Sequence, residues 1–273
     1  MSLVDETVEV PRRTMTLFFM VDTSGSMEGR KIGAVNESIQ EVLPMISDIS
    51  DANPDAEIKV AALLFSSGTS WVYDEPRLAS DFVWQDVSAI GTTDLGEACM
   101  ELNSKLSMNG FMKSASGSYA PAIILLSDGA PTDDFDHGLA KLNENRWFRH
   151  AIRIAIAIGD DADREKLAQF TGTSEAVFTV QSIDALKKMI RIAAVTSSQV
   201  GSQSSAAGGD SKPETVIKEI KGALQGSGSG SGDPEPAEPV TIDPPISYPK
   251  PAEPVMLDCP DSETNKTPYC GWD

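Results

Sequence analysis

The sequence predicts an α/β fold in which helices cover both faces of a mostly parallel, Rossmann-like sheet. The first observation is a set of continuous apolar runs, such as TLFFMV at 16–21 and APAIILL at 120–126, which are typical of strands buried on both faces. The second is the helical spacing of apolar residues between these runs, for example over 31–49. The third is their order, because strands that alternate with helices form parallel sheets with crossover helices.

The expected elements follow one another along the chain. Buried strands are predicted at 16–21, 58–65, 120–126, 151–158 and 177–180. An edge strand is expected at 71–73. Apolar residues three and four apart predict helices at 31–49, 95–106, 135–145, 163–171 and 183–195. A short helix is expected at 213–224, after a stretch rich in Ser, Gly and Ala.

The composition excludes several classes of function. The chain of 273 residues carries 22 basic and 41 acidic residues, for a formal charge of −19. This balance disfavours nucleic acid as a partner, since such binding depends on Lys and Arg that neutralise phosphates. It favours divalent cations and basic protein surfaces. No apolar run reaches the ~18 residues that a membrane span needs, and the amino terminus lacks the features of a signal peptide. We therefore expect a soluble, cytoplasmic protein.

The C-terminal part of the chain differs from the rest in composition. Residues 226–232 read GSGSGSG, a strict alternation that is typical of an engineered flexible linker. Residues 233–273 hold 10 of the 17 prolines, with nine acidic residues and two lysines, so they contribute −7 to the net charge. We expect a folded domain over 1–200, a flexible region over 201–232, and an extended acidic segment over 233–273. That last segment is interpreted as a partner fragment tethered beside its binding site.

The three cysteines do not form a disulfide framework. Cys259 and Cys270 are too far apart for the close pairs of a complete zinc site, which needs four ligands. A disulfide, two free thiols and half of a zinc ribbon contributed by a partner remain open. Cys99 lies on a predicted helix and is expected to be a small buried residue.

Polar side chains gather where the predicted strands end. Asp22, Ser24 and Ser26 follow the first strand, Thr92 and Thr93 precede the second helix, and Asp128 follows the run APAIILL. Ligands of open α/β sheets bind beyond the carboxyl ends of the strands, so we expect these side chains to meet. Carboxylates and hydroxyls without His or Cys are hard oxygen ligands, which suit Mg²⁺ or Mn²⁺.

At these residues the chain resembles the von Willebrand factor A domain. The metal-ion-dependent adhesion site of that family has the pattern seen here in VDTSGSM, GTTDLG and LLSDGAPTD, within residues 14–198. The family threonine matches Thr93 and not Thr92, because it lies two residues before the Leu-Gly of the next helix. The resemblance implies an open coordination position that a Glu or Asp of a partner protein fills. It implies a divalent cation (Mg²⁺, or else Mn²⁺ or Ca²⁺) held by Asp22, Ser24, Ser26, Thr93 and Asp128.

Within the family, VDTSGSM followed by EGRKIGAVN is most similar to the bacterial tellurium-resistance TerY type. That resemblance implies a cytosolic scaffold of a stress-response system, which works with a kinase-like and a phosphatase-like protein. It implies a binding module and not an enzyme.

Two other functions remain open. A Mg²⁺-dependent phosphotransferase of the haloacid dehalogenase type also carries an Asp after its first strand, but it needs D-x-D, and here the second position is Ser24. An interaction protein could instead act mainly through the proline-rich segment, with the α/β domain as its scaffold.

Other polar residues have simpler interpretations. Asp133 and Asp134 are interpreted as charges at a helix N-terminus. Asp94 is interpreted as a charge in a first helical turn, with a hydrogen-bond acceptor behind the metal ligands as the alternative. His137 and His150 share no motif, so we expect structural roles for both. The methionines are expected to fill the core.

Overall fold

The computed structural model describes residues 12–113, 117–160, 162–203 and 211–225. The expected linker at 226–232 and the proline-rich segment at 233–273, with Cys259 and Cys270, lie outside the described residues.

The described residues form one sheet of seven strands. The strands are β1 (Arg13–Asp22), β2 (Ala56–Ser66), β3 (Gly68–Trp71), β4 (Arg77–Leu78), β5 (Ala122–Ser127), β6 (Ile152–Ile158) and β7 (Val177–Val180). Their order is β3-β2-β1-β5-β6-β7, with β4 also paired to β2. All pairs among β1, β2, β5, β6 and β7 are parallel, whereas β3 and β4 run antiparallel to β2. The predicted, mostly parallel sheet is confirmed.

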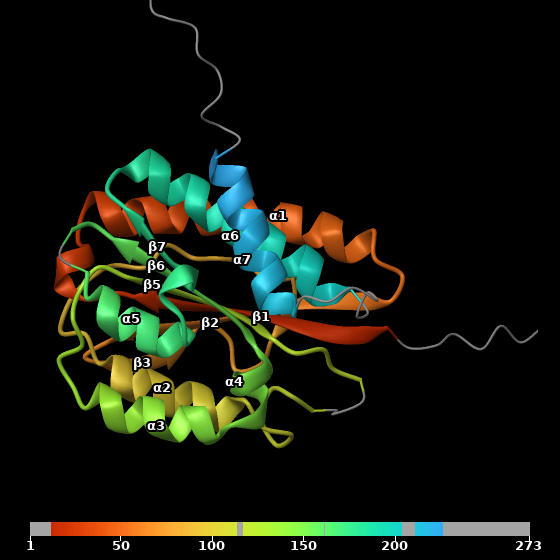
Figure 1. Cartoon of the computed structure of the whole chain (residues 1–273), viewed down its shortest axis with the longest axis horizontal. Coiled ribbons are helices and arrows are strands. Elements are labelled where there is room, and N and C mark those ends of the chain that lie inside the picture. Colours follow the sequence, from red (N-terminus) through yellow and green to blue (C-terminus); the bar gives the residue numbers. More distant parts are fainter. Residues whose placement is uncertain (1–11, 114–116, 161, 204–210, 226–273) are drawn as a thin grey trace, which may run out of the picture. The chain divides into compact units, whose positions relative to one another are not determined.

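Helices cover both faces of this sheet. They are α1 (Arg30–Asp51), α2 (Leu95–Lys105), α3 (Phe135–Glu144), α4 (Arg146–His150), α5 (Arg164–Thr171), α6 (Ile183–Ser202) and α7 (Lys212–Gln225). Two short 3₁₀ turns, Gly25–Met27 and Ser174–Ala176, complete the described elements. In Figure 1, α1, α6 and α7 lie on one side of the strands and α2, α3 and α5 on the other. The expectation of helices on both faces is therefore confirmed.

The central strand β1 shows why its sequence is apolar without alternation. Leu17, Phe19 and Val21 belong to the core beneath α1 and α6, while Phe18 and Met20 belong to the core beneath α2 and α3. All five side chains are fully buried, because successive residues of a strand point to opposite faces and both faces are covered.

Two elements near the edges differ from their predictions. The edge strand was expected at 71–73, but β3 lies earlier, because Gly68 has a φ of 96° and turns the chain back onto β2 directly after Ser66. The short helix α4 was not expected. Its first turn is capped by Asn145, whose side chain accepts the Trp147 N–H at 2.8 Å.

The expectation that 201–232 is flexible is wrong for residues 201–202 and 212–225, which are helical. Helix α6 continues to Ser202, and α7 fills Lys212–Gln225, close to the short helix predicted at 213–224. Val216 and Ile220, four residues apart on one face of α7, are fully buried and join the same core as α1 and α6. This packing holds the helix on the domain.

Among the described helices, none combines the length and the apolar composition that crossing a membrane requires.

Candidate metal centre

The predicted site residues lie at the carboxyl ends of the central strands. At this edge, the connections that follow neighbouring strands turn to opposite faces of the sheet. β1 and β5 are parallel neighbours, with Val21 opposite Leu126. Asp22 is the last residue of β1 and Asp128 is the first residue after β5, so both lie at this edge of the sheet. From β1 the chain continues into α1 on one face, and after β5 it continues into α3 on the other face. Such a switch point leaves a crevice between the two loops.

Asp22 is a carboxylate without a cationic partner among the described residues. Its side chain is fully buried. One oxygen accepts the backbone N–H of Ser24 at 2.8 Å, and the other accepts the hydroxyl of Ser127 at 2.6 Å. Burial raises the pKa of Asp22, and the nearby negative charge of Asp128 adds to this, against the hydrogen bonds that lower it. Asp22 takes part in none of the ion pairs formed by the described residues. A buried anion of this kind is suited to a cation from outside the chain.

The hydroxyls of Ser24 and Ser26 connect the first loop to Asp128. The two hydroxyl oxygens are 3.0 Å apart, and the Ser26 hydroxyl donates to Asp128 Oδ1 at 2.6 Å. Ser24 and Asp128 are buried, whereas Ser26 is exposed. The D-x-S-x-S spacing therefore does place its oxygens beside the second carboxylate.

Thr93 completes the cluster from a third loop. This loop is tied to the first by two backbone bonds, from Ile90 to Thr23 at 2.7 Å and from Gly25 to Gly91 at 3.0 Å. A methyl group on Gly129 would lie 3.6 Å from the Thr93 hydroxyl oxygen and 3.7 Å from that of Ser26. The two hydroxyls thus flank one point above the end of β5. Although Thr93 is buried, its hydroxyl forms no hydrogen bond with any described residue.

Thr92, the alternative to Thr93, has other partners. It lies in an exposed turn, and its hydroxyl bonds with Ser67 and Asp94 at 2.9 and 3.0 Å. The structure thus brings Thr93, and not Thr92, next to Ser26.

Asp94 is not merely a first-turn charge, and its interpretation from sequence needs correction. Its carboxylate accepts the N–H of Gly68 at 3.0 Å and the hydroxyl of Thr132 at 3.2 Å. The Thr132 hydroxyl in turn accepts the N–H of Thr93 at 3.0 Å. Asp94 therefore joins three loops behind Thr93, which a single helical position could not reveal.

The two acids expected at a helix N-terminus do lie at such positions, but on different helices. Asp134 caps its own helix α3 by accepting the N–H of His137 at 3.1 Å. Asp133 instead accepts the N–H groups of Gly96 and Glu97, at 2.9 and 2.7 Å, in the first turn of α2. All three bonds satisfy N–H groups that the start of a helix leaves unpaired.

Two side chains of the site were missed in the sequence. Lys31, in the first turn of α1, forms an ion pair with Asp128 Oδ2, and Ser127 donates to Asp22. The only local signals were a lysine beside the first motif and a serine directly before Asp128. Neither position shows which side chain faces the crevice.

The donor set fits a hard divalent cation that keeps part of its hydration. Among the described residues, no three His, Cys, Asp or Glu side chains gather closely enough to bind a metal by themselves. A cation in this crevice would therefore take ligands from the hydroxyls of Ser24, Ser26 and Thr93 as well as from carboxylates and water. This is the ligand chemistry of Mg²⁺ and Mn²⁺.

Together, the fold and the crevice define an α/β domain with hydroxyls and carboxylates converging at the carboxyl edge of its sheet. The von Willebrand factor type A domain matches residues 16–192, and the chain belongs to this family. No curated protein matches the chain.

Solved structures share the fold at low sequence identity. The pilus adhesin SpaC from Lactobacillus rhamnosus GG is 15% identical with a TM-score of 0.57, over 71% of this chain and 32% of that one. Proximal thread matrix protein 1 from the mussel byssus, in a structure with a zinc-occupied MIDAS motif, is 16% identical with a TM-score of 0.52, over 69% and 48%. A von Willebrand factor type A protein from Catenulispora acidiphila is 16% identical with a TM-score of 0.50, over 68% and 43%. This chain thus spans less than half the length of each of these proteins.

Proposed function

We propose that the domain is a metal-dependent protein-binding module. A Glu or Asp of a partner protein would complete the coordination of a divalent cation, Mg²⁺ before Mn²⁺ or Ca²⁺. The ligands from this chain would be Asp22, Ser24, Ser26, Thr93 and Asp128. The observation that carries the proposal is the pairing of a buried carboxylate, Asp22, that lacks a cation with the hydroxyl of Thr93, which forms no hydrogen bond with a described residue, on loops tied to each other.

The charges of the crevice favour a carboxylate as the partner's group. Asp22 and Asp128 contribute two negative charges and Lys31 one positive charge, so the side chains sum to −1. A divalent cation changes the sum to +1 and supplies a positive centre for an anionic ligand. Asp22, Ser24 and Thr93 are all buried, so they would hold the cation from the side of the protein interior and exclude water there.

The finer context of this function rests on the sequence motifs. We propose a cytoplasmic scaffold of the TerY type in a bacterial stress-response or tellurium-resistance system, with kinase-like and phosphatase-like partners. It would bind and not catalyse, which agrees with the description of SpaC as an adhesin. Residues 233–273 would be a fused partner fragment, as their proline content and the preceding GSGSGSG suggest.

Replacing Thr93 by alanine tests the ligand set. We expect Thr93→Ala to lower the affinity for Mg²⁺ at least tenfold in isothermal titration calorimetry. We expect little change in metal-free thermal stability, because the lost hydroxyl bonds to no described residue. Thr92→Ala removes a neighbouring hydroxyl that bonds only outside the crevice and should bind Mg²⁺ like the wild type. Equal affinities of the two variants would contradict the assignment of Thr93.

A carboxylate probe tests the open position. In the Mn²⁺-loaded protein, acetate should displace a metal-bound water and lower the Mn²⁺-induced relaxation rate of water protons. Acetamide, which has the same shape without the charge, should not. A relaxation rate that acetate leaves unchanged would speak against a free coordination position, whereas failure of Mn²⁺ to bind at all would speak against the site.

The role of Lys31 can be tested by whether its replacement raises or lowers the affinity for Mg²⁺. Its ammonium group is a competitor for Asp128, so Lys31→Met should raise the affinity for Mg²⁺ about tenfold, or about 1.4 kcal/mol. Lys141→Met removes the same charge from an ion pair with Glu144 on α3 and should leave the Mg²⁺ affinity unchanged. If Lys31→Met instead weakens Mg²⁺ binding, the lysine serves to orient Asp128.

A further inference from the structure

Most side chains of the short helix α4 are not buried against the domain. Only one of its five side chains, Phe148, is fully buried, where it contacts Phe170 edge-to-face with ring centroids 5.3 Å apart. The Asn145 cap fixes the start of the helix and donates to the backbone carbonyl of Leu106 at 2.9 Å. Phe148 and the Asn145 cap thus hold the helix on the domain, and the partly buried Trp147 packs against the same core. The other three side chains of the helix, those of Arg146, Arg149 and His150, are exposed.

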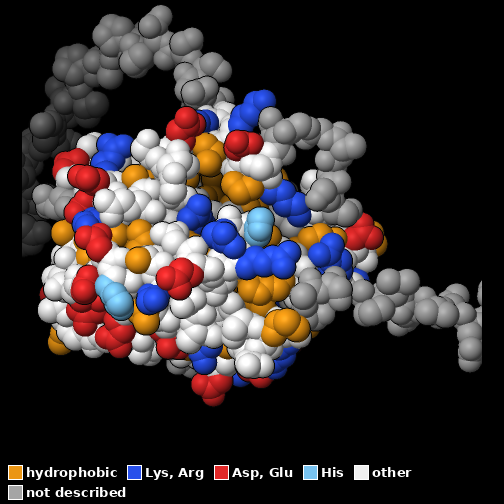
Figure 2. Space-filling model, turned by 60° about the horizontal axis from the view of Figure 1, so that its bottom comes forward, with side chains coloured by type: hydrophobic (Ala, Val, Ile, Leu, Met, Phe, Trp, Pro, Cys, Tyr) orange, Lys and Arg blue, Asp and Glu red, His pale blue; other side chains and the backbone are white. Residues whose placement is uncertain are grey.

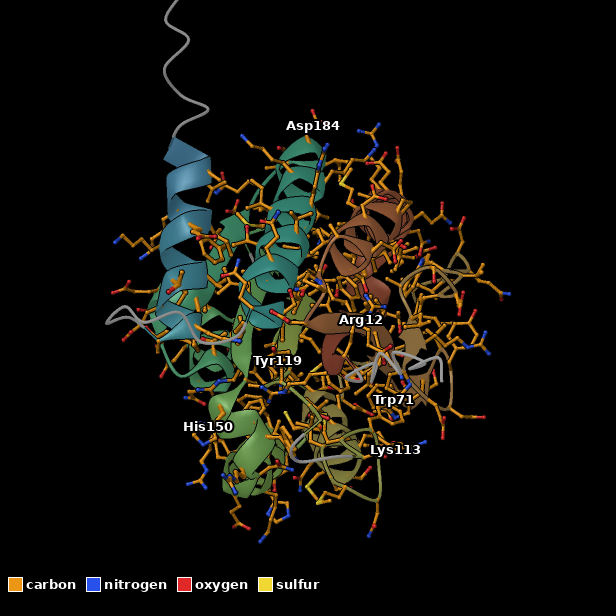
Figure 3. The ribbon with its side chains drawn as sticks, turned by 90° about the vertical axis from the view of Figure 1, so that its right-hand side faces the viewer. Arg12, Trp71, Lys113, Tyr119, His150 and Asp184 are labelled. Atoms are coloured by element: carbon orange, nitrogen blue, oxygen red, sulfur yellow. The ribbon has the colours of Figure 1, made fainter. Side chains whose placement is uncertain are left out.

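The outward residues surround a hollow. Met108, Ala120, Arg146, Trp147 and His150 line a surface pocket of about 320 Å³. Its lining combines three apolar side chains with a guanidinium and an imidazole. Figure 3 shows the labelled His150 at the outer side of α4.

Three of these residues differ from the expectations for their types. Met108 is 58% exposed, so the prediction that the methionines fill the core is wrong for this one. His150 is exposed and forms no hydrogen bond with a described residue, so it has no structural role in the core. Trp147 is only partly buried, although its ring is large enough to stabilise a core. Trp, Met and Arg are enriched in protein interfaces, and Trp and Arg dominate their binding energy.

The positive charge of this surface is not neutralised within the domain. All seven ion pairs among the described residues use a lysine, and none includes Arg146 or Arg149. Both arginines are exposed, on a chain whose net charge is −19. Figure 2 shows Lys and Arg side chains gathered around a histidine beside hydrophobic surface, on the side that Figure 1 shows at the bottom.

We propose that the α4 surface, defined by Met108, Ala120, Arg146, Trp147, Arg149 and His150, binds an acidic segment of a partner protein. A large apolar side chain of that segment would enter the pocket, and flanking Asp or Glu carboxylates would contact the two arginines. Charge complementarity selects an anionic occupant. The apolar lining residues Met108, Ala120 and Trp147 select a peptide over a nucleic acid, whose phosphates the net negative charge of the chain would repel.

The α4 surface and the metal centre lie at opposite edges of the sheet. Helix α4 leads directly into the start of β6, at the amino-terminal edge, whereas Asp22 ends β1 and Asp128 directly follows β5, at the carboxyl edge. One partner at each edge can therefore be bound at the same time. This inference does not depend on the metal site, and its test is carried out in the presence of EDTA.

The test is a fluorescence anisotropy titration of the full chain with a labelled twelve-residue peptide that carries one central Leu among Asp and Glu residues. We expect binding that weakens with salt, and at least a tenfold loss of affinity in Arg146→Glu/Arg149→Glu. The matched control is Arg164→Glu/Arg191→Glu, which makes the same charge change at exposed arginines of α5 and α6 and should bind almost as the wild type does.

Two further measurements separate the pocket from general charge attraction. Met108→Glu changes an exposed side chain, so it should leave folding intact but lower the affinity as strongly as the double variant. A peptide with Ser in place of its Leu should bind at least fivefold more weakly. The proposal is overturned if the acidic peptide does not bind, if both double variants lose affinity equally, or if single-stranded DNA of the same charge binds more tightly.

Discussion

Replacing Asp22 by asparagine is expected to abolish Mg²⁺ binding and, at the same time, to raise the stability of the metal-free domain. Asp22 is fully buried, and among the described residues it receives two hydrogen bonds but no cation. Each unit by which burial raises its pKa costs the folded state about 1.4 kcal/mol at a pH above that pKa. Asparagine keeps the shape but removes the buried charge. Its oxygen can still accept the Ser24 N–H, and its NH₂ group can donate to the Ser127 hydroxyl, which reverses the second hydrogen bond.

The sign of the pH dependence follows from the raised pKa of Asp22. The folded state holds this proton more tightly than the unfolded state, whose pKa is near 3.8. In EDTA, the penalty from Asp22 is therefore fully present above the folded-state pKa and is relieved as the pH falls toward 3.8. The difference in melting temperature between Asp22→Asn and the wild type should be largest near pH 7 and should shrink toward pH 4.5. Thermal melts of both proteins over this range measure it.

Asp128→Asn provides the contrasting variant. Asp128 is buried like Asp22, but its charge is paired with Lys31 and it accepts the Ser26 hydroxyl. Its neutralisation leaves the lysine without its partner, so metal-free stability should fall and not rise, while Mg²⁺ binding is lost in both variants. A metal-free Asp22→Asn protein that melts below the wild type at pH 7 would contradict the account of Asp22.

The substitution Gly138→Ala is expected to destabilise the domain by about 3 kcal/mol or more. A methyl group at this position of α3 would lie 2.2 Å from the carbonyl oxygen of Gly96 in α2. That neighbour is backbone, so the two helices would have to move apart. Denaturant unfolding measures the loss, and Mg²⁺ titration should show reduced affinity as well, because Thr93 lies just before α2 and would shift with it.

Gly33→Ala is the matched control for that prediction. Gly33 also lies within a helix, α1, but a methyl group there would have no heavy atom within 4 Å. Alanine is the better helix former by about 0.5–1 kcal/mol, so this variant should be at least as stable as the wild type. Similar losses in both variants would show that the close approach of α2 and α3 does not explain the effect of Gly138.

Local patterns were sufficient for most of the fold. Runs such as TLFFMV and AIRIAIAI identified buried strands, because a strand covered on both faces has apolar residues at successive positions. Long amphipathic helices such as α1 were equally clear. The five residues of α4 were too few to show a period, and its capping by Asn145 depends on the way α3 ends.

For the site, too, some features followed from the sequence and others depended on tertiary contacts. The residues proposed as ligands could be named because a parallel sheet brings the loops after its strands to one edge, and the resemblance to the von Willebrand factor A motif selects among their side chains, Thr93 over Thr92 included. The partners that Asp94 joins behind Thr93 and the exposure of Met108 could not be derived from the sequence, since each depends on which loops or helices lie beside the residue.

The sequence by itself determined the class of fold, the order of strands and helices along the chain, and the oxygen chemistry of the proposed metal centre. Periodicity and residue type are local properties, and they decide which face of an element is buried. Tertiary structure alone decided that Lys31 neutralises Asp128, 97 residues away, and that Gly96 and Gly138 allow two helices to touch. It also left the basic, apolar surface of α4 facing outward. These relations depend on side chains and backbones brought together from distant parts of the chain, where no local pattern records which groups will meet.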